Sequence, residues 1–447
     1  MQNNSMNRYF IICLILLCFS KMNAQSPVWS LNKAIEEAQK NRKLLASLET
    51  AYKINQLKTK ELNAKYLPKV SLNYNYQYNS IIPTSVLPAG AFTSGVPLDG
   101  VIPIKLGANY SQNAGVLLQQ PLLDISISKL ITESKLQEKL ASLTEKEARL
   151  ELVYEVSKVY FNTLVAEEQV KEAIGDTIRT ALSLKTINQK YSNKRVLKVD
   201  VNDAKVTHNN AVQKYRNAAN NALVLKQYLL YVTGNESSLA SSMVLEKYSM
   251  NEDISDFDEN LIQALPQIEI LKTQNEVLEN KKKLERAKYS PIINVNGYLG
   301  ADQFSENMNP FKQDSWYGNS YIGVSLKLPV LFGENTAKRI GQLKFQQEQN
   351  NNQIVEDVNK NKYNALNATA AYNNVLQQLK TVRENSRLTS EIVAVYQERY
   401  KFDQIAFNEL NDKEIQLQNL ELLCNQLQKE LVVSWLDWKK AAGKLVL

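Results

Sequence analysis

Four short segments of the chain alternate between apolar and polar residues, which is the period of a β-strand with two unlike faces. The clearest has serine, asparagine and glutamine between Val70, Leu72, Tyr74, Tyr76 and Tyr78. The others are marked by Ala114, Val116 and Leu118; by Ile293, Val295 and Leu299; and by Ile322, Val324, Leu326 and Leu328. We predict strands at about 69–79, 110–120, 292–302 and 318–328. Each is about ten residues long, which suits a strand tilted across a bilayer. A small soluble hairpin with one buried face would show the same pattern.

The rest of the chain repeats apolar residues at spacings of three and four, the period of a helix with one apolar stripe. No proline lies between Pro121 and Pro266 or after Pro329, so very long helices are permitted. We predict two helices of about 66 residues, on the order of 100 Å each, at 125–191 and 334–400. Shorter helices are expected at 31–66, 201–231, 259–289 and 410–440. Two short helices placed end to end would match one long helix in length.

The two halves of the chain repeat each other. Ala64-Lys65-Tyr66-Leu67-Pro68 recurs as Ala287-Lys288-Tyr289-Ser290-Pro291, Pro121 matches Pro329, and Tyr191 matches Tyr400. The offset between the halves falls from 223 to 208 across the first hairpin, so about 15 extra residues lie in the first loop. We therefore expect a first helix–strand–strand–helix repeat at 25–240, a linker or equatorial segment at 241–258, and a second repeat at 259–447.

The first 24 residues are typical of a secretory signal peptide, with Arg8 before an apolar run of about ten residues and a cleavage site after Ala24. Cys18 follows Leu17 and not a small residue, which disfavours a lipid anchor. Cleavage would leave Cys424 as the single cysteine, so no internal disulfide is expected, and would lower the net charge from +7 to +5. No later run of 18 apolar residues is present, which leaves a periplasmic, secreted or barrel-forming protein.

The composition argues against catalysis. The chain has one histidine, three cysteines and 14 glycines, with no phosphate-binding glycine motif. His208 has no neighbouring metal-ligand residues in sequence, and Cys424 lies among leucines in a helical segment. Lysines and glutamates interleave instead of clustering, which does not suit nucleic-acid binding. We expect a protein that is not an enzyme and that has no metal, cofactor or nucleic-acid partner.

The repeated motifs described above occur twice in the same order, and with this arrangement the chain resembles the TolC-type outer-membrane efflux family over essentially the whole mature sequence. Gln120-Pro121-Leu122-Leu123-Asp124 is similar to the family's hairpin-to-helix junction, and each tip tyrosine, Tyr191 and Tyr400, is followed nine residues on by an acid, Asp200 or Glu409. The resemblance implies a mostly α-helical chain with a small β part. Long coiled-coil-like helices would form a periplasmic α-barrel, and four amphipathic transmembrane strands per chain would be completed to a closed β-barrel by trimerisation. Because a bilayer tolerates no unpaired strand edges, four strands require an oligomer in any case, but eight, twelve or sixteen strands would satisfy closure.

The resemblance also implies a function: a passive channel in a tripartite efflux or type I secretion system, in the outer membrane and extending into the periplasm. The implied partners are two further copies, a periplasmic adaptor, an inner-membrane pump or secretion ATPase, and outer-membrane lipid. Adaptor docking and gating are expected at the helix tips, at Tyr191, Lys194, Asp200, Tyr400, Asp403 and Glu409. Family members often carry glycine where this chain has Lys194 and Asp403. The two acids could instead cap the returning helices.

The strand residues expected to face lipid or its interface are Val70, Leu72, Tyr74, Tyr76, Tyr78, Val116, Leu118, Val324 and Leu326. A periplasmic coiled-coil adaptor or scaffold that never enters the membrane is the alternative, since it would share long helices and export. Such a protein would not need four amphipathic strands.

Overall fold

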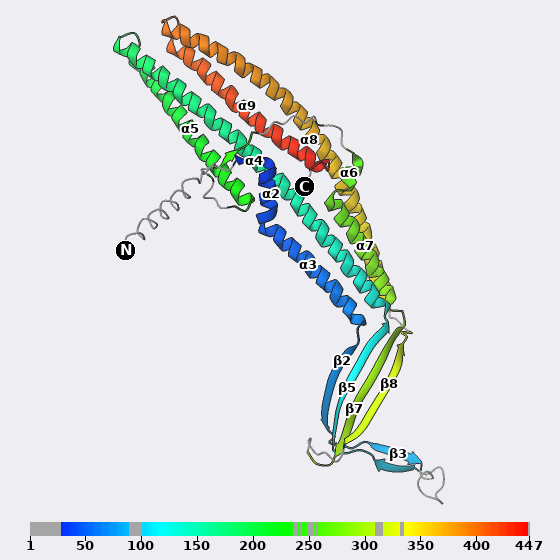
Figure 1. Ribbon diagram of the computed structural model, residues 1–447. Coiled ribbons are helices and arrows are strands. Elements are labelled where there is room, and N and C mark those ends of the chain that lie inside the picture. Colours follow the sequence, from blue (N-terminus) through cyan, green and yellow to red (C-terminus); the bar gives the residue numbers. More distant parts are fainter. Residues whose placement is uncertain are drawn as a thin grey trace, which may run out of the picture. The chain divides into compact units, whose positions relative to one another are not determined.

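The computed structural model describes residues 28–88, 101–235, 240, 243–247, 254, 258–308, 316–330 and 335–445. The predicted signal peptide, with Cys13 and Cys18, and most of the predicted linker lie outside these residues. The chain is mostly α-helical with a small sheet part, which confirms the predicted fold class (Figure 1). No helix in the described part of the chain combines the length and apolarity needed to cross a bilayer.

The helices occupy both repeats. They are α2 (Leu31–Asn41), α3 (Lys43–Asn63), the 3₁₀ turn η2 (Ala64–Tyr66), α4 (Ile125–Ser192), α5 (Lys198–Val232), α6 (Glu259–Gln263), α7 (Pro266–Ala287), α8 (Asn335–Lys401) and α9 (Phe407–Ala441). The strands are β1 (Val28–Trp29), β2 (Lys69–Tyr78), β3 (Thr84–Pro88), β4 (Val101–Lys105), β5 (Tyr110–Leu123), β6 (Val244–Leu245), β7 (Ile292–Ser305) and β8 (Trp316–Lys327).

Two helices that were predicted to be continuous are broken, so those predictions were wrong. The segment 259–289 divides into α6 and α7 because Pro266 opens α7, and a residue that precedes proline is disfavoured in helical geometry. The segment 31–66 divides at Arg42, whose backbone is extended. The Arg42 guanidinium donates to the Tyr231 carbonyl at 3.3 Å and lies 5.1 Å from that ring, a contact no local pattern reveals.

The chain divides into two compact units, each built from both repeats. The sheet unit comprises Thr50–Ser142 and Ile270–Ile354. Its antiparallel sheet has the order β2-β5-β7-β8, so β2 and β8 are its edge strands. The register aligns the repeats side by side: Leu72 pairs with Val116, and Val116 with Leu299. The extra residues of the first loop include a separate hairpin of β3 and β4.

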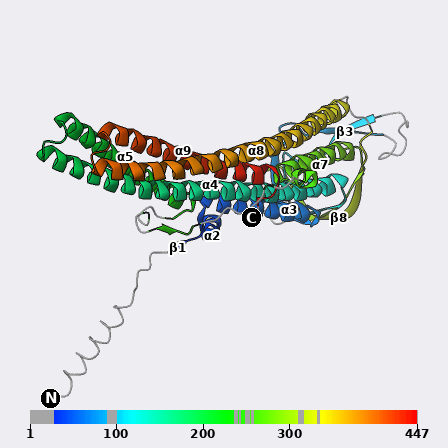
Figure 2. The same ribbon diagram turned by 90° about the horizontal axis from the view of Figure 1, so that it is seen from above.

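The helical unit comprises the described parts of Met1–Glu49, Leu143–Glu269 and Val355–Leu447. In it α5 lies beside α4, and α9 beside α8 (Figure 2). Its main core gathers large buried side chains such as Leu229, Leu379, Trp435 and Leu436. The Tyr160 hydroxyl is buried in this core. It lies 2.8 Å from the carbonyl oxygen of Trp29, in β1, and 2.8 Å from that of Glu246, which follows β6. It thereby ties the short parallel pair β1–β6 to the helices.

Candidate functional sites

The two long helices of the helical unit end in the same kind of turn. Lys194 follows α4 with φ 56°, and Asp403 follows α8 with φ 57°; these are the positive-φ residues other than glycine in the described chain. In each turn the next N–H donates to a carbonyl five residues back, at 2.9 Å after α4 and 3.0 Å after α8. Glycine adopts this left-handed backbone without a steric cost. That geometry explains why these are the positions at which TolC-type sequences often carry glycine.

Each returning helix is capped by the acid that the sequence placed there. The N–H of Leu197 donates to Asp200 Oδ2 at 2.8 Å before α5, and the N–H of Ala406 donates to Glu409 Oε1 at 3.2 Å before α9. Leu197 and Ala406 have no side-chain oxygen, so only one half of the usual reciprocal capping pair exists. Each acid therefore accepts from one of the backbone N–H groups that the start of a helix leaves without a partner.

A charged network joins the two tips. The buried ammonium group of Lys190, on α4, donates to the Tyr400 carbonyl and lies 2.6 Å from Asp403 Oδ1. Arg195 reaches the other carboxylate oxygen of Asp403 at 3.1 Å. The hydrogen bond from Lys190 is the main reason that the pKa of Asp403 lies below its usual range. The same ammonium lies 3.9 Å from the centre of the Tyr400 ring, and burial raises the pKa of that tyrosine to about 12.

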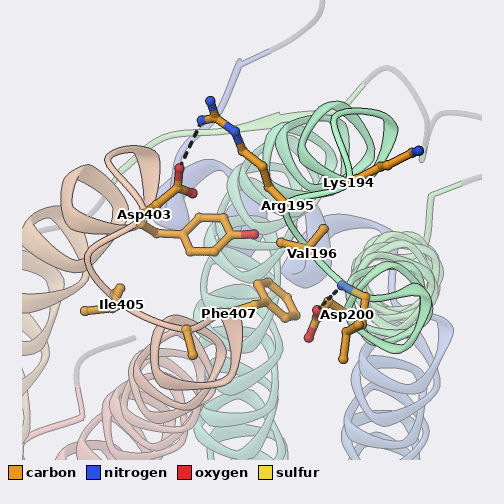
Figure 3. Close-up of a pocket in the computed structure, with 10 residues that line it drawn as sticks. Lys194, Arg195, Val196, Asp200, Asp403, Ile405 and Phe407 are labelled. Atoms are coloured by element: carbon orange, nitrogen blue, oxygen red, sulfur yellow. Dashed lines mark hydrogen bonds and ion pairs between the residues drawn. The ribbon is translucent and has the colours of Figure 1, made fainter.

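An open cavity of about 630 Å³ lies between the two tip turns (Figure 3). Apolar side chains line it together with the Arg195–Asp403 pair, and the ring of Phe407 packs 6.0 Å from that of Tyr400. Lys194 extends away from Asp403 (Figure 3). The arrangement offers a charged and apolar surface on which another protein segment could dock.

The predicted tip residues thus differ in the contacts that their side chains make. Tyr400 and Asp403 join the network, whereas the exposed Tyr191 lies under Lys198, 5.3 Å from the ring centre. The sequence reasoning missed Lys190 and Arg195. Their only signal was their closeness to Tyr191, because their partner is more than 200 residues away.

A second feature of the helical unit is a layer of acids on α4 and α9, in which Asp176 and Glu414 are buried and Glu421 is half-buried. Asp176 is paired with Arg179 at 2.6 Å and with Lys214 at 3.3 Å. Burial, and then the charge of Asp176, raises the pKa of Glu421 to about 7. Burial also raises the pKa of Glu414, which accepts a hydrogen bond from a glutamine of α8. His208 contacts a threonine hydroxyl at 3.1 Å, and the described residues contain no group of three that could hold a metal ion.

In the sheet unit, all nine strand residues named from the sequence lie on one face. Every second residue of a strand shares a face, and the register places the rows Val70–Leu118, Leu72–Val116 and Val295–Val324 together. This face is strongly exposed: Leu72 is 81% exposed and Val324 69%. At the end of the face nearest the first loop lie the aromatic residues Tyr74, Tyr76, Tyr78, Tyr110 and Trp316. An exposed apolar band bordered by aromatic rings suits the boundary between hydrocarbon and water.

No protein family's sequence profile matches the chain, and no curated protein matches it. Several solved structures match the chain. The chain superimposes on the CusC transmembrane channel with a TM-score of 0.74, at 11% identity and over 92% of each chain. It matches the CmeC outer-membrane channel of Campylobacter jejuni with a TM-score of 0.72, at 16% identity, over 93% of this chain and 85% of that one. The MtrE outer-membrane channel of Neisseria gonorrhoeae matches with a TM-score of 0.69, at 19% identity, over 92% of this chain and 88% of that one.

The chain has the fold of TolC-type outer-membrane channels. The TolC-type fold accounts for the paired long and short helices and for the four-stranded sheet with two open edges. It confirms the resemblance that the repeated motifs indicated.

Proposed function

We propose that this protein is the outer-membrane channel subunit of an efflux or type I secretion system. The observation that carries the proposal is the exposed apolar face of the sheet. On an isolated soluble chain, a face with Leu72 at 81% exposure and Ile322 at 81% would favour aggregation. In a bilayer the same face needs no further cover.

The open edges β2 and β8 support an assembly of several copies. Each edge presents unpaired backbone groups, which hydrocarbon does not tolerate. Pairing β8 of one copy with β2 of the next closes the sheet into a barrel, and the TolC-type fold suggests three copies and twelve strands. The polar face, which includes Asn73, Asn113 and Asn296, would then line the lumen.

The tips supply the gate in this proposal. The network of Lys190, Asp403 and Arg195 holds the turns of α4 and α8 together within one chain. Docking of an adaptor at the tip cavity would compete for these charges and let the turns separate. Because the chain shows no energy-coupling motif, an inner-membrane pump or secretion ATPase would drive transport.

Membrane fractionation tests the central claim. Expressed with its leader in a bacterium, the chain should be recovered from the outer-membrane fraction and extracted in detergent as a trimer. Recovery as a soluble periplasmic protein would overturn the channel and favour the adaptor or scaffold alternative.

A deletion tests the gate separately. Removing residues 192–199 should abolish both adaptor binding and efflux in cells while leaving outer-membrane recovery unchanged. Intact efflux and adaptor binding after this deletion would refute the gating role of the tips without affecting the channel itself. The exchange Asp403→Asn, which keeps the size of the side chain, should instead weaken the closed state while leaving the tip in place.

A further inference from the structure

The four strands of the sheet contain very few charges. Within β2, β5, β7 and β8 the charged residues are Lys69, Asp302 and Lys327. Asp302 is therefore the single carboxylate of the strands. It lies near the loop end of β7, whereas the two lysines lie at the ends of β2 and β8 nearest the helices.

The register assigns Asp302 to the polar face. It pairs with Asn113 on β5 and with Tyr317 on β8. Asn113 in turn pairs with Asn75, which alternates with the exposed tyrosines of β2 and so points to the opposite side. A carboxylate on this face is directed away from the apolar band.

The carboxylate keeps its charge uncompensated. Asn113 donates to Asp302 Oδ1 at 2.9 Å, and Asn319 donates to Oδ2 at 3.1 Å. Both donors are neutral amides, and Asp302 forms no ion pair with any residue that the structure describes. The two hydrogen bonds fix the position of the carboxylate and leave its negative charge to act on the solvent beside the sheet.

The neighbouring Tyr298 lies flat against the sheet. A side-chain carbon at Gly115 would come within 2.5 Å of its ring, and one at Gly300 would also collide with its hydroxyl oxygen. Asn113 donates to that oxygen at 2.6 Å, and the ring stacks with Tyr321 at 5.8 Å. The two glycines therefore leave the space in which the ring lies against the sheet.

We propose that Asp302 makes the lumen select for cations near its outer end. This inference rests on the proposed function: closure by three copies would place three such carboxylates in one ring, a device that attracts cations and repels anions. Lys327 lies ten residues farther along β8 than the partner of Asp302, which is about 33 Å at a strand rise of about 3.3 Å per residue. At that distance, beyond the Debye length of about 10 Å in 0.1 M salt, the lysines do not neutralise the ring.

The test is ion selectivity in planar lipid bilayers. Purified protein is inserted, and the reversal potential is measured across a tenfold KCl gradient for the wild type, Asp302→Asn and Lys327→Gln. We expect Asp302→Asn to lower the potassium-to-chloride permeability ratio about two- to fourfold. The effect is modest because the Asp302 carboxylates would lie on the order of 10 Å from the pore axis, and water and salt screen their charge over that distance. Lys327→Gln should raise the ratio. Hexaamminecobalt(III) added from the loop side should block the wild type and lose its effect on Asp302→Asn.

The asparagine variant fits the site, because the amides of Asn113 and Asn319 can turn to present either oxygen or nitrogen. If it fails to assemble, Asp302→Ser gives the same prediction. An unchanged ratio and unchanged block in a conducting Asp302→Asn channel would overturn this inference and leave the proposed function standing. Absence of conductance both from the wild type and from Asp403→Asn, whose closed state should be weakened, would overturn both.

Discussion

Glycine placed at the two tip turns should have opposite effects, although the turns have the same backbone. Lys194 and Asp403 hold left-handed φ angles of 56° and 57°. Lys194 makes no side-chain hydrogen bond or ion pair in the described part of the chain, so Lys194→Gly removes only backbone strain. Asp403→Gly removes the same strain and also the carboxylate that pairs with the buried Lys190 at 2.6 Å.

The magnitudes follow from these contacts. Relief of a left-handed backbone yields about 1–2 kcal/mol, from which the greater freedom of glycine in the opened state subtracts about 0.5–1 kcal/mol. Lys194→Gly should therefore stabilise the tip by about 0.5–1 kcal/mol. Loss of the hydrogen-bonded charge on Lys190 costs about 1.5–3 kcal/mol, so Asp403→Gly should destabilise it by a net ~1–2 kcal/mol.

Hydrogen exchange followed by mass spectrometry measures this opening locally. Peptides covering the two turns should exchange about two- to fivefold more slowly in Lys194→Gly, and about five- to thirtyfold faster in Asp403→Gly. In the second variant the acceleration should reach both turns, because Lys190 belongs to the other tip. Asp403→Asn, whose side chain tolerates the left-handed region, isolates the charge. A shift of both glycine variants in the same direction would refute this division between strain and ion pairing.

Three further predictions concern other parts of the chain. Glu421 has a pKa raised from 4.5 to about 7, so its contribution to stability is fully present below pH 4.5 and is lost as the pH rises through 7. Discounted for its partial exposure, Glu421→Gln should gain about 1–2 kcal/mol over the wild type at pH 8 and nothing at pH 4; equal melting shifts at both values would contradict this. Leu72→Lys should cost about 2–4 kcal/mol of membrane insertion and reduce recovery from the outer membrane, whereas Asn73→Lys on the polar face should insert normally; equal losses would exclude a lipid-facing band. Tyr160→Phe removes the hydrogen bonding of the hydroxyl with the carbonyl groups of Trp29 and Glu246, although the Trp29 carbonyl still accepts from the Glu246 N–H, and should destabilise the helical unit by about 0.5–1.5 kcal/mol in a denaturant titration. An unchanged midpoint would show that water replaces the hydroxyl.

Much of the fold could be predicted because it depends on local periods. Alternation over two residues predicted the strands, and β2 spans Lys69–Tyr78 where 69–79 was expected. The absence of proline predicted the long helices, and α4 spans Ile125–Ser192 where 125–191 was expected. Capping of the returning helices was one of the two roles that the sequence suggested for Asp200 and Glu409, and it depends on a relation confined to four residues.

The sequence by itself therefore determined the periods, the duplication and the ends of the long elements. Only the tertiary structure decided what crosses between the repeats. The pairing of Lys190 with Asp403 spans 213 residues, and the clamp on Asp302 by Asn113 spans 189. The break at Arg42 likewise depends on a tyrosine 189 residues away. Side chains so far apart in sequence meet only after the helices pack and the strands pair, since no local period encodes which residue of one repeat will face which residue of the other.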